Sequence, residues 1–110
     1  MPADYPLLRE VFPDLVTELR DLLELQEETA LASATEDLRL VERCTCKDRS
    51  CQSIRTVYRP EGGSYGPGHR NVVLRPAKGM LILDVVDGQI MYVEILDRPR
   101  MRRRRPWSRK

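Results

Sequence analysis

All three cysteines of the chain, Cys44, Cys46 and Cys51, fall within one eight-residue run, Cys-Thr-Cys-Lys-Asp-Arg-Ser-Cys. Thiolates grouped so closely can bind a soft metal ion or form a redox pair, because either chemistry needs sulfur atoms within a few ångströms of one another. Structural zinc usually takes four ligands, thiolate sulfur with or without imidazole nitrogen. The single histidine, His69, is the one residue that could complete the set, so the sequence suggests a Cys3His zinc site.

The cysteine spacing leaves other interpretations open. The familiar zinc pattern is two Cys-x-x-Cys pairs, whereas this chain has Cys-x-Cys followed by a single cysteine. On an extended strand, Cys44 and Cys46 point to the same face, as two ordinary buried residues also would. One alternative is therefore three reduced thiols, with His69 in an exposed loop. A thiol redox role is another, although the Cys-x-x-Cys that lowers a thiol pKa at a helix N-terminus is missing.

A glycine-rich segment, residues 59–70, contains four glycines and two prolines and predicts a loop. It is not a phosphate-binding loop, since it lacks the Gly-Lys-Ser/Thr ending and does not precede a helix. Binding residues concentrate on exposed loops. Tyr65, His69 and Arg70 are therefore predicted to form a contact surface, the alternative being a purely structural connection.

The charges divide sharply along the chain. Residues 1–97 hold eleven Lys/Arg and seventeen Asp/Glu, a net charge of −6, while residues 98–110 hold eight Lys/Arg and no acidic residue. We expect one domain over residues 1–97 and a disordered basic tail over residues 98–110. Such a tail can bind nucleic acid by releasing counterions and stacking an aromatic ring on a base, or can fold back on the acidic domain. The nucleic-acid interpretation rests on Arg102, Arg103, Arg104, Arg105 and Trp107.

The elements that position these groups follow from hydrophobic periodicity. Apolar residues at spacings of three and four predict an amphipathic helix over residues 13–27, after a short N-terminal turn. Residues 29–37 form a short second helix or a loose connection. A period of two from residue 38 to 43 and again from 53 to 58 predicts a β-hairpin with the cysteines at its tip.

A second hairpin is predicted over residues 80–96, where Asp87-Gly88 favours a type I′ turn between two β-prone runs. In that register Val85 opposes Ile90, Leu83 opposes Tyr92 and Ile82 opposes Val93. Asp84 and Glu94 then lie on opposite faces, which argues against a shared acid–base site. With no oriented nucleophile either, we expect no enzyme activity.

Together with a short strand at residues 71–74, these pieces predict an α+β fold of two layers. The N-terminal amphipathic helix packs on an antiparallel meander of about five strands. The length of 110 residues fits one domain. No apolar run reaches the roughly 18 residues of a membrane span, and the N-terminal residues do not resemble a signal peptide. We therefore expect a cytoplasmic protein with no membrane association and with reduced thiols.

The chain resembles a family of small uncharacterised bacterial proteins. The resemblance covers residues 1–97 and rests on residues 5–13, the Cys44-x-Cys46-x4-Cys51 cluster, and residues 63–71 and 79–90. It implies no activity, and residues 98–110 lie outside it. The run from residue 87 to 96 is similar to the ending of another group of short bacterial β-rich proteins.

The sequence as a whole favours a non-enzymatic binding domain. Its most natural partner is another protein, contacted through the cysteine hairpin and the loop that ends at His69. The first alternative is a zinc-stabilised module that binds nucleic acid through its basic tail, and the second is a thiol-based redox protein.

Overall fold

The structure is a computed structural model that describes residues 5–46, 48, 50–58 and 65–104. Short helices form its first layer. They are α1 (Leu8–Val11), α2 (Pro13–Leu25), α3 (Thr29–Ala34) and the 3-10 turn η2 (Thr35–Asp37). Pro13 begins α2 because a proline at the first helical position lacks only an N–H that would have no helical partner there. The helix ends two residues earlier than predicted, since Glu27 adopts the left-handed φ of 62° that often follows a helix end.

Five antiparallel strands form the second layer: β1 (Glu42–Arg43), β2 (Ile54–Arg55), β3 (His69–Leu74), β4 (Met80–Val86) and β5 (Gln89–Leu96). Their order across the sheet is β1-β2-β5-β4-β3. The predicted α+β class is confirmed. The sheet is not one continuous meander, however, because β2 pairs with β5 and not with β3, the next strand along the chain. The two edges of the sheet are therefore β1 and β3.

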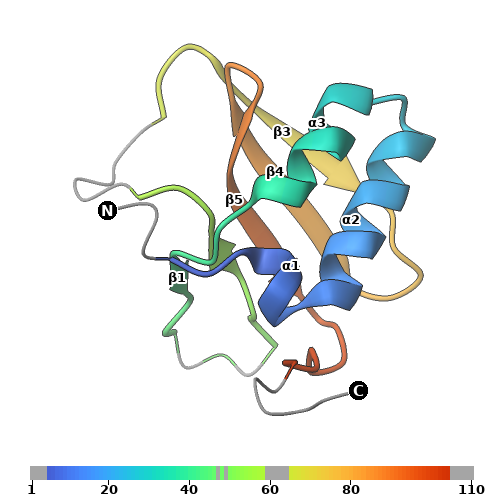
Figure 1. Ribbon diagram of the computed structural model, residues 1–110, viewed down its shortest axis with the longest axis vertical. Helices are drawn as coiled ribbons and strands as arrows, with labels where there is room; N and C mark the ends of the chain where they lie inside the picture. Colours follow the sequence, from blue (N-terminus) through green and yellow to red (C-terminus); the bar gives the residue numbers. More distant parts are fainter. Residues whose placement is uncertain (1–4, 47, 49, 59–64, 105–110) are drawn as a thin grey trace.

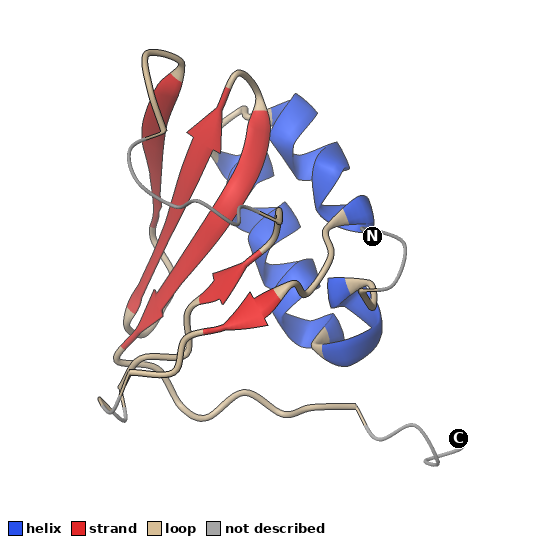
Figure 2. Cartoon of the chain, turned by 90° about the vertical axis from the view of Figure 1, so that its left-hand side faces the viewer, coloured by secondary structure: helices blue, strands red, loops and turns tan. Residues whose placement is uncertain are grey.

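The helices lie together on one side of the sheet (Figures 1 and 2). Leu15, Leu19 and Leu23 of α2 are buried with Leu83 and Val93 of the sheet in a single hydrophobic core. The spacing of three and four predicted this helical face, because such residues lie on one side of an α-helix. Within the described part of the chain, no helix combines the length and the apolar character needed to cross a bilayer.

The hairpin of β4 and β5 differs from prediction by one residue. Asp87 and Gly88 both have positive φ, as a type I′ turn requires, and Val85 pairs with Ile90 as expected. The register then shifts beside Asp84, so that Leu83 pairs with Val93 and not with Tyr92. A β-bulge adds one residue to a strand, so each side chain beyond the bulge points to the face opposite the one predicted without it.

This shift corrects the predicted placement of the two carboxylates in the hairpin. Asp84 now pairs with Tyr92, and Ile82 pairs with Glu94. Because alternate residues of a strand share a face, Asp84 and Glu94 lie on the same face of the sheet. That face is the one opposite the helices, where both carboxylates are half-buried.

The cysteine hairpin has the shortest strands, since β1 and β2 have two residues each where longer strands were predicted. Additional hydrogen bonds extend the pairing beyond them. The amide of Cys44 donates to the carbonyl of Ser53 at 2.9 Å, and the amide of Val41 donates to the carbonyl of Arg55 at 3.0 Å. The predicted placement of the cysteines at a hairpin tip is therefore confirmed, on a hairpin with little regular structure of its own.

Candidate metal centre

The loop between β1 and β2 turns back on itself at Asp48. One carboxylate oxygen of Asp48 accepts hydrogen bonds from the amide and the hydroxyl of Ser50, at 2.9 and 2.8 Å. The Asp48 carbonyl accepts a third from the amide of Cys51 at 3.1 Å. An aspartate that bonds the backbone two residues ahead makes a compact turn. This turn returns the chain to the first two cysteines.

The three sulfur atoms consequently lie together. The Sγ atoms of Cys44, Cys46 and Cys51 are all within 4.8 Å of one another, and all three residues are free cysteines. Cys44 and Cys51 are half-buried, whereas Cys46 is exposed. Sulfur atoms about 2.3 Å from a shared zinc ion would need only small movements from this arrangement. The three cysteines could therefore hold one metal ion.

Two hydrogen bonds that involve sulfur support this arrangement. The amide of Cys46 donates to Sγ of Cys44 at 3.4 Å. The thiol of Cys51 donates to the hydroxyl oxygen of Ser53 at 3.5 Å, and this oxygen also accepts from the amide of Ile95 at 2.9 Å. When Cys51 is a thiolate, the Ser53 hydroxyl can donate to it instead. Partners of this kind orient metal ligands and favour thiolates.

The thiols differ in how readily they ionise. Hydrogen bonds from the side chain and backbone of Ser53 lower the pKa of Cys51 below its ordinary value. A hydrogen bond between the Cys46 thiol and the Cys44 side chain raises the pKa of Cys46 to about 11. Of Cys46 and Cys51, Cys51 therefore ionises more easily in the metal-free protein, and Cys46 keeps its proton at neutral pH.

A pocket of about 360 Å³ opens beside the sulfur atoms. Its walls are Arg43, Cys44, Cys46, Asp48, Cys51, Gln52 and Arg100. Asp48 lines the pocket, but its carboxylate does not belong to the set of ligand atoms that all lie within 4.8 Å of one another. Gln52 and Arg100 were not predicted from the sequence to belong to the site.

Gln52 holds the C-terminal segment, residues 98–104, against this hairpin. Gln52 is 4% exposed, and its Nε2 donates to the carbonyl of Pro99 at 3.1 Å while its Oε1 accepts from the amide of Met101 at 2.9 Å. Further along, the amide of Arg104 donates to the carbonyl of Val11 at 2.9 Å. The segment therefore crosses from the cysteine hairpin to α1.

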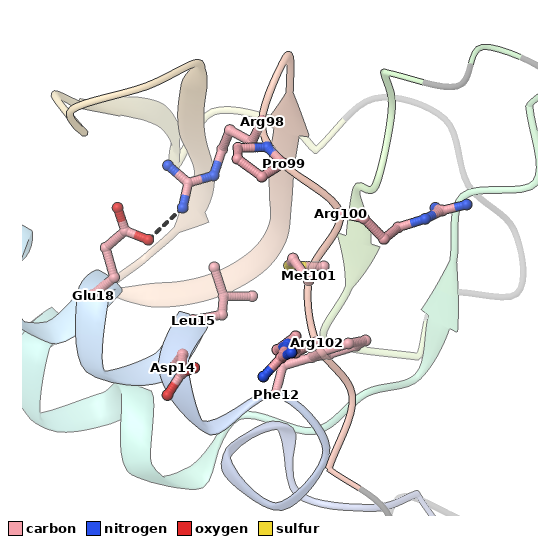
Figure 3. Close-up of a pocket in the computed structure, with 9 residues that line it drawn as sticks. All are labelled: Phe12, Asp14, Leu15, Glu18, Arg98, Pro99, Arg100, Met101 and Arg102. Atoms are coloured by element: carbon pink, nitrogen blue, oxygen red, sulfur yellow. Dashed lines mark hydrogen bonds and ion pairs between the residues drawn. The ribbon is translucent and has the colours of Figure 1, made fainter.

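The predicted boundary between a domain and a disordered tail after Asp97 is corrected for residues 98–104. Arg98 forms an ion pair with Glu18 of α2, and Arg102 lines a pocket together with Phe12 (Figure 3). The amino-acid composition shows that the segment is basic, but it does not show which backbone and side-chain groups bind the segment to the domain. Arg102, Arg103 and Arg104 are exposed, while Arg105 and Trp107 lie outside the described residues. Binding of nucleic acid by these residues stays a prediction.

The structure does not bring His69 to the cysteines. His69 begins β3, at the sheet edge opposite β1, and pairs with Val86 next to the turn of the second hairpin. Its Nε2 lies 2.8 Å from Oδ1 of Asp84, which also accepts a hydrogen bond from Asn71 at 2.6 Å. The prediction that His69 is the fourth ligand is therefore wrong. The glycine-rich loop was expected to fold back over the cysteines, but the sheet order places its end on the far edge.

Replacement of His69 by alanine tests this correction. Because the imidazole lies across the sheet from the sulfur atoms, His69→Ala is expected to leave zinc affinity within about twofold of that of the unmodified protein, well short of the 10- to 100-fold that loss of even an outer-shell partner costs. Competition with a chromophoric chelator measures the affinity. A tenfold or larger loss in a variant that keeps its circular dichroism spectrum would restore His69 as a ligand.

The predicted contact surface is also divided. The Tyr65 ring packs against His69 with ring centroids 5.0 Å apart. Arg70, the next residue of β3, points to the opposite face and makes two hydrogen bonds of 3.0 Å to the Glu28 carboxylate, beside the helices. This guanidinium lowers the pKa of Glu28. Arg70 therefore does not share a surface with His69, and both are remote from the cysteine hairpin.

The structure thus joins three of the four predicted ligands and adds Ser53, Gln52, Arg43 and Arg100 around them. Ser53 and Gln52 directly follow Cys51, but only their hydrogen bonds to other elements show what they do. Comparisons with protein-family models, with curated proteins and with solved structures gave no match to this chain.

Proposed function

We propose that this protein is a metal-binding module that holds one soft or borderline ion, with Zn²⁺ the first candidate, on Cys44, Cys46 and Cys51. The observation that supports this most directly is the set of three sulfur atoms within 4.8 Å of one another. Thiolate ligands select Zn²⁺, Cu⁺ and iron–sulfur clusters over the hard ions Mg²⁺ and Ca²⁺.

A metal at this position has a structural role. β1 and β2 have only two residues each, and such a hairpin has little stability of its own in water. An ion shared by Cys44 before the turn and Cys51 after it closes the hairpin loop. The backbone of Cys51 also forms an isolated antiparallel β-bridge with Leu96 at the end of β5, so the ion connects the hairpin to the central part of the sheet.

The experiment is a zinc titration of protein purified without a histidine tag under reducing conditions. We expect about one equivalent of zinc per chain. Because the metal displaces protons from thiols, including Cys46 with its raised pKa of about 11, the apparent affinity should rise between pH 6 and 8. Each displaced proton contributes about a tenfold rise per pH unit.

Two results would contradict the proposal. One is less than about a tenth of an equivalent bound with zinc in excess of the protein, far below the affinity of structural thiolate sites. The other is an affinity that does not change with pH, because thiolate ligation requires proton release. If the reduced protein instead forms a disulfide in air and binds no metal, the redox interpretation replaces this one.

A further inference from the structure

The cysteine site has three protein ligands where zinc takes four. Among the described histidine, cysteine, aspartate and glutamate residues, no fourth group lies with the three sulfur atoms. One oxygen of the nearby Asp48 carboxylate accepts hydrogen bonds from the amide and the hydroxyl of Ser50. Zinc sites with three protein ligands keep the fourth position for water or another small molecule.

Two arginines border the same pocket. Arg43 directly precedes Cys44, and its guanidinium carbon lies 5.2 Å from the centroid of the Phe12 ring. Arg100 comes from the C-terminal segment. Figure 3 shows Arg98 and Arg100 leaving this segment in different directions, Arg98 toward Glu18 and Arg100 away from α2. Within the described part of the chain, neither Arg43 nor Arg100 forms an ion pair with a carboxylate.

The backbone on either side of Arg100 is held by hydrogen bonds to the cysteine loop. The buried Gln52 side chain bonds the carbonyl of Pro99 and the amide of Met101, which flank Arg100 on either side. The amide of Asp97 also donates to the carbonyl of Ser50 at 3.0 Å. The backbone at Arg100 is therefore tied to the same loop that carries the cysteines.

These arginines offer N–H donors at the wall of the pocket. Both residues are exposed, and an anion in the pocket would be held by hydrogen bonds from their guanidiniums. The guanidinium fork matches a carboxylate in two parallel hydrogen bonds. A pocket of about 360 Å³ is at the small end of ligand sites, which run from roughly 300 to 1,000 Å³.

We propose that the fourth position of the metal takes a small thiol that carries a carboxylate, an inference that rests on the metal site proposed above. The sulfur of the ligand binds the metal as a thiolate, and its proton passes to solvent. Its carboxylate contacts the guanidiniums of Arg43 and Arg100. No electron is transferred, and the ion reaches the four-sulfur coordination common for zinc.

The test uses the full chain loaded with Co²⁺, whose visible spectrum reports coordination number and whose near-ultraviolet bands report cobalt–sulfur bonds. The probe is 3-mercaptopropionate, and 3-mercaptopropanol is the matched control because it has the same thiol but no carboxylate. We expect the carboxylate to tighten binding about tenfold, the equivalent of one charge-assisted contact. Inorganic phosphate tests for a general anion site.

Arg100→Ala should remove the tenfold preference while the cobalt–sulfur bands of the protein remain. The matched variant is Arg102→Ala on the same segment, which should keep the preference because Arg102 does not line the pocket beside the sulfur atoms. The segment itself stays docked in both variants, because its contacts with Gln52 involve the backbone.

The inference is overturned if both thiols bind equally, if Arg100→Ala keeps the preference, or if phosphate competes with 3-mercaptopropionate at equal concentration. The inference also fails if the thiol removes cobalt from the protein, which is detected as cobalt that passes a membrane that retains the protein. Failure of the metal site itself looks different: the protein then shows no cobalt–sulfur bands before any thiol is added, and both proposals fall.

Discussion

Replacing Cys46 with serine is expected to lower zinc affinity by more than about 100-fold, the upper end of what the loss of an outer-shell partner costs. The hydroxyl of serine stays protonated near neutral pH and is a far weaker zinc ligand than a thiolate. Cys46 is the best position for this test because its side chain is exposed, so the substitution does not disturb the core. The measurement is a competitive zinc titration at fixed pH.

The same variant links metal binding to folding. Zinc binds the folded chain, so an excess of the ion should raise the melting temperature of the unmodified protein by several degrees. Cys46→Ser should show no such rise. Its melting temperature without metal should equal that of the metal-free unmodified protein, which serves as the control. Equal zinc affinities in the two proteins would exclude a site made of these cysteines.

Leu83→Ala is expected to lower the free energy of unfolding by about 2–5 kcal/mol, the range for a leucine removed from a packed core. Leu83 is fully buried on the face of β4 that packs against the helices. Guanidinium denaturation followed by circular dichroism measures the loss. Because a small domain has only about 5–15 kcal/mol of stability, the variant should unfold at a clearly lower denaturant concentration.

Val73→Ala is the matched control on the opposite face of the sheet. Val73 is 52% exposed on β3, and its replacement should cost less than about 1 kcal/mol, the span of strand propensity. The comparison tests which face of the sheet is packed. A loss at Val73 as large as that at Leu83 would show that the face away from the helices is also covered.

Local patterns predicted the fold well where one residue type has one structural effect. Pro13 marks the start of α2, and Asp87-Gly88 marks the turn of the second hairpin. The β-bulge beside Asp84 had no such mark, because neither strand contains a glycine or proline that would signal an extra residue. The placement of Asp84 and Glu94 on one face therefore depended on the pairing itself.

The candidate site was predictable only in part, for a related reason. Close spacing kept the three sulfur atoms near one another in any compact loop. His69 is eighteen positions further along the chain than Cys51, and its location depends on which strand lies beside which. Because β2 pairs with β5 and β3 lies at the other edge, His69 is carried away from the cysteines to Asp84.

By itself, the sequence determined a single α+β fold with a helical layer, and a cluster of three thiols at a hairpin tip. Both follow from contacts between residues close in the chain. Only the tertiary structure decided the strand order, the docking of residues 98–104 through Gln52, and the placement of Arg43 and Arg100 at the pocket that the cysteines line. These contacts join residues far apart in the chain, and such partners are selected by burial and hydrogen bonding across the whole domain and not by local spacing.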